Sequence, residues 1–272
     1  MVIRWACWAC CCLLLCFAPS VAAARLVVLA PNLVELLYSI DAGSQIVGTV
    51  EFADYPEAAK QLPRLGNFQG IQLEKIIALK PDLVLYWRSG SKPQDIESLT
   101  RLGIKSVGFE PQQPADIVGL LKHLGELTGQ QQKAQTLAKQ TEQRLGALKV
   151  YQQGRTVSVF YEIWHDPLTT VGSNDWPAQA LKLCGAVASP ALTTAYPQVS
   201  IERLVATPPE LLILPSSVNE PRAHFDYQQW PALSKLPQLT VNADLLHRAT
   251  LRTIDGIEQL CQGIERLRHQ AR

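Results

Sequence analysis

Short apolar runs alternate with helix-like segments along the chain from Arg25 onward. The run Leu26–Leu29 predicts a buried strand. After it, leucine and isoleucine recur three and four positions apart, and we expect Asn32 to cap this helix and Gly43 to end it. Further strands are predicted at 46–49, 83–86 and 105–109, and further helices at 72–79 and 93–101. Continuous apolar strands separated by helices indicate a parallel sheet covered on both faces.

The segment from residue 114 to 150 has a different pattern, rich in Gln, Lys, Ala and Leu. We expect Gly125 and Gly129 to divide it into two helices, the second about 20 residues long from Gln130. Such a helix spans about 30 Å at 1.5 Å per residue, the width of a small lobe. It is therefore predicted to be a rigid connector.

The alternation of strands and helices resumes after Gly154. Strands are predicted at 156–161, 210–214 and 238–242, and helices at 177–183, 200–206, 226–233 and 251–269. The second half of the chain thus has the pattern of the first.

One segment of the sequence occurs in two similar copies. Residues 71–86 read IQLEKIIALKPDLVLY and residues 199–214 read VSIERLVATPPELLIL, so that Glu74 aligns with Glu202 without a gap. An internal duplication explains this match. The chain is predicted to be an α/β protein of two Rossmann-like lobes with parallel central sheets joined by one long helix. The predicted bounds are 25–125 for the first lobe, 126–150 for the connecting helix and 151–272 for the second lobe.

The first 24 residues have the features of a secretory signal peptide. Arg4 is their only charge, an apolar run follows to Phe17, and three alanines end at Ala24, where we expect cleavage. The apolar run is short for a membrane span, which needs about 20 residues. A retained anchor and a lipidated Cys16 are the alternatives, and the bulky Leu15 argues against lipidation.

Removal of this leader changes the charge and the cysteine count. Without Arg4 the chain has 24 basic and 24 acidic residues, and this balance argues against a nucleic-acid partner. Five of the seven cysteines lie in the leader. The remaining two, Cys184 and Cys261, are predicted to form a disulfide in an oxidising compartment.

The loops that follow the predicted strands nominate a ligand site, because ligands in open α/β sheets bind beyond the carboxyl ends of the strands. These loops, together with segments before the two repeat copies, are aromatic with few charges, which suits a large, flat, mostly apolar ligand. The nominated segments are 31–32, 51–52, 87–90, 162–167 and 243–250, together with Phe68 and Tyr196 ahead of the two repeat copies.

Simpler explanations exist for single members of this set. Trp87 would serve equally as a cap on the sheet, and Asp244 and Arg248 stand four apart like an ordinary surface pair.

An enzyme or a metal site is disfavoured by the sequence. His165, Asp166 and His247 offer acid and base groups, but no activated nucleophile or catalytic motif accompanies them. The five histidines lack the spacing of metal ligands. We therefore assign no catalytic residue, no metal ligand and no cofactor.

Three stretches carry a family resemblance. The runs RLVVLAPNLVELLYSIDAG, VGTVEFADYPEAAKQLPRLGNFQGIQLEKIIALKPDLVLYWRSG and YPQVSIERLVATPPELLIL resemble the periplasmic cobalamin-binding proteins of ABC importers. The wider group also carries siderophores and haem. The likeness covers essentially the whole chain after the leader, and it departs from the family pattern at Phe52, Phe68, Tyr196 and the Leu245–Leu246 pair, where other aromatic residues are expected.

The resemblance implies a periplasmic protein, monomeric when free, that holds a corrinoid between its lobes and delivers it to the transmembrane subunits of an ABC importer. It implies that the ligand is contacted by Phe52, Phe68, Trp87, Trp164 with Ile163 as its alternative, Tyr196, Asp244 and Arg248. It also implies that Glu74 and Glu202 dock the permease, although a carboxylate at a helix start is favoured by the helix dipole alone. A siderophore or haem binder of the same fold is the alternative, and the small number of basic residues near the cleft, Arg88 and Arg248, argues against an anionic ligand.

Overall fold

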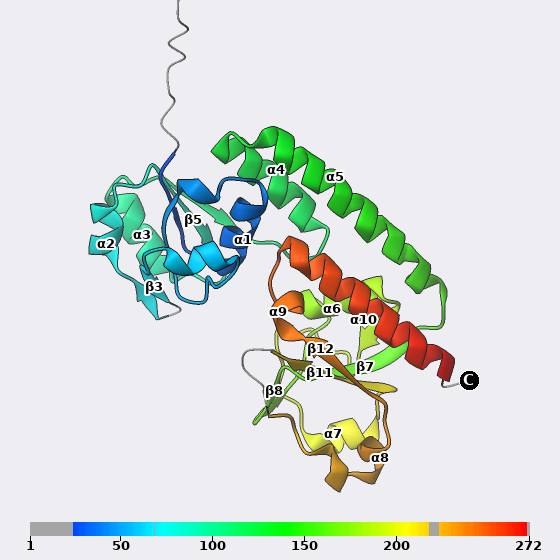
Figure 1. Ribbon diagram of the computed structural model, residues 1–272. Helices are drawn as coiled ribbons and strands as arrows, with labels where there is room; N and C mark the ends of the chain where they lie inside the picture. The colour runs from blue at the N-terminus through cyan, green and yellow to red at the C-terminus, as the bar shows by residue number, and fades with distance from the viewer. Residues whose placement is uncertain (1–23, 68, 218–222, 271–272) are drawn as a thin grey trace, which may run out of the picture.

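The computed structural model describes residues 24–67, 69–217 and 223–270. They form two lobes, each built on a four-stranded parallel sheet (Figure 1). The predicted leader, except Ala24, and the candidate Phe68 lie outside the described residues. The α/β class and the two parallel sheets confirm the fold predicted from the apolar pattern.

The N-terminal lobe has the strand order β2-β1-β5-β6. Helices α1, α4 and α5 cover one face of its sheet, and α2 and α3 cover the other, as the two apolar clusters on either side of the sheet show. The elements are β1 Leu26–Val28, α1 Pro31–Ser39, β2 Ile46–Thr49, α2 Leu73–Ala78, β5 Leu83–Trp87, α3 Pro93–Arg101, β6 Ser106–Phe109, α4 Asp116–Thr128 and α5 Gln131–Ala147.

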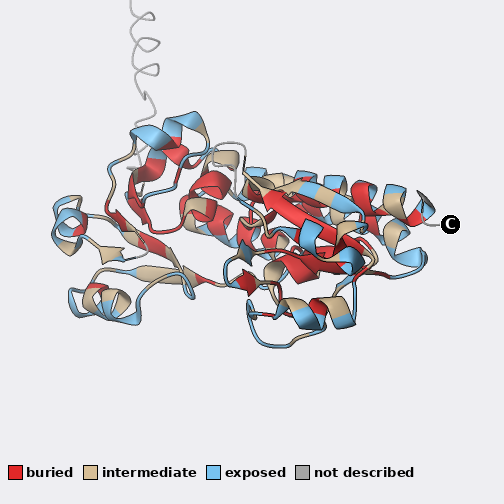
Figure 2. Ribbon diagram, turned by 90° about the horizontal axis from the view of Figure 1, so that it is seen from below, coloured by how far each residue is buried: buried red, intermediate tan, exposed pale blue. Residues whose placement is uncertain are grey.

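The C-terminal lobe has the order β10-β7-β11-β12. Helices α6 and α10 pack on one face and α7 and α8 on the other. The elements are β7 Val157–Tyr161, α6 Trp176–Leu183, β10 Ala186–Ala188, α7 Ile201–Ala206, β11 Leu211–Ser216, α8 Pro231–Ser234, β12 Gln238–Asn242, α9 Ala243–Leu246 and α10 Leu251–Gln270. The strands β1, β7 and β11 are almost entirely buried, whereas the edge strands β6 and β12 are largely half-buried or exposed (Figure 2).

The two lobes have the same topology. Numbered within its own lobe, each sheet has the order second, first, third, fourth strand. The repeated segment forms α2 and the start of β5 in one lobe, and α7 and the start of β11 in the other. The bounds of the two helices and the starts of the two strands differ by the same 128 positions. The duplication seen in the sequence is therefore also a duplication of structure.

Short elements complete the chain. Two small hairpins were not predicted: β3 Gly66–Asn67 with β4 Gly70–Ile71, and β8 Trp164–His165 with β9 Leu168–Thr169. The short 3-10 helices are η1 Gly43–Gln45, η2 Glu57–Gln61, η3 Leu148–Gln153 and η4 Tyr227–Gln229. Because η4 and α8 divide the segment 226–233, the single helix expected there is absent.

Helix α5 connects the lobes, and α10 runs beside its second half (Figure 1). The guanidinium of Arg144 on α5 pairs with Asp255 at 2.6 Å and with Glu258 at 2.8 Å on α10. The start of α10 also crosses into the N-terminal lobe, where Ala249 and Ile254 join its apolar core.

A second polar network joins the lobes near the start of α10. Glu35 on α1 is buried, and its Oε1 forms ion pairs with the guanidinium of Arg252 at 2.7 Å and with that of Arg248 at 3.2 Å. Arg248 also pairs with Asp54 at 2.6 Å, and the Arg252 guanidinium lies 3.8 Å from the centre of the Tyr55 ring. We call these five residues the interlobe network.

Three local expectations were wrong. Helix α1 begins at Pro31, which is pre-organised for a first helical position, so that Asn32 lies inside the helix instead of capping it. The helix ends at Ser39, and Gly43 opens η1. Gly125 lies inside α4 and does not end it. A Cβ at this position would lie 2.4 Å from the Cβ of Ala134, so the glycine allows α5 to pack closely against α4. Gly129 does end α4, with a φ of 74°.

The predicted disulfide is present. Cys184 at the end of α6 and Cys261 in α10 are bonded and fully buried. The bond closes a loop with a sequence separation of 77.

Replacing both Cys184 and Cys261 with alanine is expected to lower the free energy of unfolding by about 2–4 kcal/mol, because a long loop is released in the unfolded chain. Denaturant unfolding measures this loss. Mass spectrometry of the non-reduced wild-type protein is expected to find no free thiol, and two free thiols would contradict the assignment.

Candidate functional site

A cavity of about 160 Å³ lies between the two lobes. Aromatic and proline side chains form most of its wall, and none of the lining residues is Lys, Arg, Asp or Glu. The lining residues are Trp87, Pro111, Ile163, Trp176, Pro177, Tyr196, His247 and Ala249.

The cavity lies where the fold brings strand ends together. Trp87 is the last residue of β5, Pro111 follows β6, and Ile163 follows β7. Trp176 and Pro177 begin α6, while His247 and Ala249 lie between β12 and α10. These are the carboxyl ends of parallel strands in both lobes, where open α/β sheets bind their ligands.

Trp87 forms the wall contributed by β5. Its side chain is half-buried, and its indole Nε1–H donates a hydrogen bond to Glu110 Oε1 at 3.1 Å. The ring therefore has a defined orientation at the cavity.

Tyr196 forms part of the opposite wall and is 49% exposed. Its backbone has a φ of 43°, in the left-handed region that a bulky residue rarely adopts. Its backbone N–H donates to Asp175 Oδ2 at 2.8 Å, and the same oxygen accepts from Gly172 at 2.7 Å. Burial raises the pKa of the Tyr196 phenol and the Asp175 carboxylate raises it further, so the hydroxyl is neutral at physiological pH.

Two predicted aromatic residues lie outside the cavity wall. Phe52 is 62% exposed, and Trp164 in β8 is 48% exposed. Ile163, the alternative to Trp164, lines the cavity. Phe52 also has a left-handed backbone, with a φ of 66°. Strained non-glycine residues of this kind persist where the surrounding structure holds them, often at binding sites.

The two predicted polar residues have protein partners. Asp244 Oδ2 accepts a hydrogen bond from the Ser217 hydroxyl at 2.6 Å. Arg248 belongs to the interlobe network. Burial by itself would lower the pKa of Arg248, but its hydrogen bond with Asp54 and the charges of Asp54 and Glu35 outweigh this effect and raise it.

A buried carboxylate fixes the chain beside Ile163. Glu162 Oε1 lies 2.9 Å from His224 Nδ1, and Glu162 Oε2 accepts a hydrogen bond of 2.5 Å from the Tyr227 hydroxyl. Burial raises the pKa of Tyr227, and the Glu162 charge adds to this shift. The cluster anchors residues 224–227 to the end of β7.

Three of the lining residues lie outside the segments that the sequence nominated. Pro111, Trp176 and Pro177 follow predicted strands or begin a predicted helix, which was an available signal. His247 and Ala249 lie in the nominated segment 243–250, but neither was singled out as a ligand contact. In the structure, His247 Nε2 lies 2.9 Å from the Tyr161 hydroxyl.

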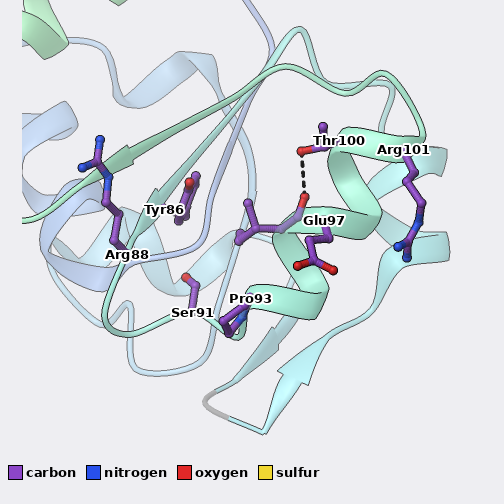
Figure 3. Close-up of a pocket in the computed structure, with 8 residues that line it drawn as sticks. Tyr86, Arg88, Ser91, Pro93, Glu97, Thr100 and Arg101 are labelled. Atoms are coloured by element: carbon purple, nitrogen blue, oxygen red, sulfur yellow. Dashed lines mark hydrogen bonds between the residues drawn. The ribbon is translucent and has the colours of Figure 1, made fainter.

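A larger hollow of about 500 Å³ lies on the α3 side of the N-terminal lobe (Figure 3). Tyr86, Arg88, Pro93 and Arg101 are among its lining residues, all of which come from β5, α3 and the loop between them. The dashed bond in Figure 3, from Thr100 Oγ1 to the Ile96 carbonyl at 3.0 Å, is internal to α3. The C-terminal lobe contributes nothing to this hollow.

Neither a metal centre nor a membrane span is found in the described part of the chain. Residues 24–67, 69–217 and 223–270 contain no cluster of three His, Cys, Asp or Glu side chains arranged to hold a metal ion. Among these same residues, no helix combines the length and apolarity needed to cross a bilayer.

A family model described as periplasmic binding protein matches residues 26–238. The chain belongs to this family. Periplasmic binding proteins are non-enzymatic components of transport systems, in agreement with the expectation that the chain is not an enzyme.

Curated members of the family named vitamin B12-binding protein are similar over nearly the whole chain. The protein of Vibrio vulnificus strain YJ016 is 33% identical over 257 residues, covering 92% of this chain and 94% of its own. That of Pectobacterium carotovorum strain PC1 is 31% identical over 274 residues, covering 98% and 97%.

Solved structures give the same relationship. The periplasmic vitamin B12 binding protein of Vibrio cholerae has a TM-score of 0.81 and 30% identity, and the match covers 90% of this chain and 98% of that one. A periplasmic haem-binding protein from Roseiflexus has a TM-score of 0.78 at 19% identity, which shows a shared fold only.

Proposed function

We propose that the chain is exported to the periplasm, binds a corrinoid between its lobes and delivers it to the transmembrane subunits of an ABC importer. The observation that carries this proposal is the placing of Trp87 and Tyr196, from opposite lobes, on one uncharged cavity. The similarity to vitamin B12-binding proteins over nine-tenths of the chain supports the choice of ligand class.

The cavity is too small to enclose a whole macrocycle, because sites that hold drug-sized ligands measure about 300–1,000 Å³. A corrin ring would therefore lie across the mouth of the cavity, with its apolar faces against Trp87 and Tyr196. The exposed rings of Phe52 and Trp164 would meet its periphery. Hydrogen-bonding groups such as Asp244 would meet its amide side chains.

The charges in the structure argue further against an anionic siderophore. Arg248 is neutralised by Glu35 and Asp54, and Arg88 lines the hollow beside α3. Neither guanidinium is placed at the cavity wall.

Haem is the second candidate, and His247 on the cavity wall is the observation that favours it, since histidine is a common axial ligand of haem iron. The Tyr161 hydroxyl orients this imidazole.

Calorimetric titration with cobalamin, cobinamide, haem and a ferric siderophore tests the ligand class. We expect tight binding of a corrinoid and at least 100-fold weaker binding of the others, a difference of about 2.7 kcal/mol. Preferential binding of haem or of the siderophore would overturn the corrinoid assignment.

Replacing Phe52 with glycine is expected to weaken corrinoid binding about fivefold without destabilising the fold. The exposed ring is lost, but the left-handed backbone, which costs a bulky residue about 1–2 kcal/mol, is relieved. Calorimetry measures the affinity and thermal unfolding measures the stability.

Lys80→Gly is the matched control, because Lys80 also has a positive φ, of 46°, but precedes β5 at the amino end of the parallel strands, whereas Phe52 follows β2 at their carboxyl end. It is expected to leave affinity unchanged. An equal loss of affinity in both variants would remove Phe52 from the binding site.

A further inference from the structure

Glu110 is the polar neighbour of the cavity wall on the N-terminal lobe. Its carboxylate accepts three hydrogen bonds, all from the segment that begins at Trp87. The Trp87 indole donates to Oε1 at 3.1 Å, the Ser89 hydroxyl donates to Oε1 at 2.8 Å, and the Ser89 backbone N–H donates to Oε2 at 2.8 Å.

The sheet places these groups together. Strands β5 and β6 are parallel neighbours, with Trp87 opposite Phe109, and the Arg88 backbone N–H donates to the Phe109 carbonyl at 3.0 Å. Glu110 follows Phe109 directly and therefore reaches the indole from a fixed backbone. Both Trp87 and Glu110 are half-buried, which limits the competition from water for this bond.

The indole N–H is the only hydrogen-bonding group of a tryptophan side chain, so its bond to Glu110 fixes how the ring is turned about its own axis. A ring held in its binding orientation loses less conformational freedom when a ligand arrives. A hydrogen bond to an ionised carboxylate is stronger than one to a neutral acceptor.

We propose that Glu110 is a positioning residue, which holds the Trp87 ring against the cavity before the ligand binds and so raises the affinity for the ligand. This proposal rests on the function proposed above. Glu110 itself need not touch the ligand, because it acts through Trp87.

A double-mutant cycle tests this action, with cobinamide as the probe. Glu110→Ala is expected to weaken binding about tenfold, whereas Glu110→Gln, which keeps an acceptor for the indole, is expected to weaken it less than threefold. In a Trp87→Phe background, where no N–H is available, Glu110→Ala is expected to cost nothing further. Ser89→Ala, which removes one donor to Glu110 but leaves the Trp87 bond, is the control and is expected to bind like the wild type.

A second measurement needs no ligand. In protein labelled with 15N-tryptophan, the Trp87 indole signal is identified by its loss in Trp87→Phe. We expect its hydrogen exchange to be at least tenfold faster in Glu110→Ala than in the wild type. The melting temperature of each variant shows whether it is folded.

The outcomes separate the two proposals. Failure of the wild type to bind any corrinoid would overturn the proposed ligand, and indole exchange would still decide whether Glu110 holds the ring. If the wild type binds and Glu110→Ala weakens binding equally with and without the Trp87 indole, or if indole exchange is unchanged, the positioning role is wrong.

Discussion

Replacing Glu35 with alanine is expected to lower the free energy of unfolding by about 3–5 kcal/mol, the range found when one partner of a buried ion pair is removed. The Glu35 side chain is 3% exposed and forms ion pairs with Arg248 and Arg252, which lie at and just before the start of α10. Its loss leaves Arg252 without a carboxylate partner, and Arg248 with Asp54 alone. Because the network joins the lobes, we also expect the start of α10 to exchange its amide hydrogens faster.

Glu258→Ala is the matched control for Glu35→Ala. Glu258 also joins the two helices at the lobe junction, through Arg144, but both side chains are more than one-third exposed. A pair of this kind contributes about 1 kcal/mol or less. Denaturant unfolding of the two variants measures the difference, and equal losses would show that the interlobe network does not stabilise the fold in particular.

The interlobe network is expected to weaken only in acid. Burial by itself would raise the pKa of Asp54, but the hydrogen bond and charge of Arg248 outweigh it and lower that pKa. A carboxyl group with a lowered folded-state pKa contributes stability above its unfolded-state value, and the contribution is lost as the pH falls through the lower value. At neutral pH the contribution of Asp54 is fully present.

Replacing Glu74 and Glu202 together with alanine is expected to reduce transport at least tenfold in vesicles that contain the permease. Each acid lies in the first turn of a short helix, α2 or α7, at equivalent places in two lobes of identical topology. Both side chains are exposed, and no ion pair in the described residues involves either of them. We propose that these two acids dock the permease, because two equivalent acids would suit a permease with twofold symmetry, on which each would meet a basic pocket.

Corrinoid affinity and melting temperature are expected to stay unchanged in this double variant. Charge pairing at an interface sets register and association rate, so the transport defect is expected to be largest at low ionic strength. Glu142→Ala, which removes an exposed acid from the connecting helix α5, is the control and is expected to transport normally. Normal transport by the double variant, or a loss explained by unfolding, would show that both acids only stabilise the starts of their helices and do not dock the permease.

The fold was predictable because its signals are local. Apolar runs predicted the central strands, and the repeated segment predicted two equivalent units. The helix and strand of one copy start 128 positions after those of the other, as in the sequence alignment. Gly125 was misinterpreted because the reason for a glycine there is its contact with Ala134, a residue of the next helix. Asn32 was misinterpreted because Pro31 also fits a helix start and occupies the first position.

The candidate site was only partly predictable, since its wall is assembled across the lobes. Trp87 and Tyr196 were selected from their loops and both line the cavity. The contribution of Trp176 depends on how α6 is placed against the other lobe, which no local pattern specifies. The partners of Arg248 on α1 and in the loop after β2 lie about 200 positions away in the chain, and the sequence alone could not pair them.

The central claim is that a corrinoid binds between the lobes, and two neighbouring residues of β5 and its loop test it most directly. Trp87 lines the cavity between the lobes, whereas Arg88 lines the hollow beside α3. In calorimetric titrations with cobinamide, we expect Trp87→Ala to weaken binding about 30-fold, or about 2 kcal/mol, as for a central aromatic contact. Arg88→Ala is expected to bind within threefold of the wild type. Unchanged binding by folded Trp87→Ala, together with a loss in Arg88→Ala, would contradict the account and move the ligand out of the cleft.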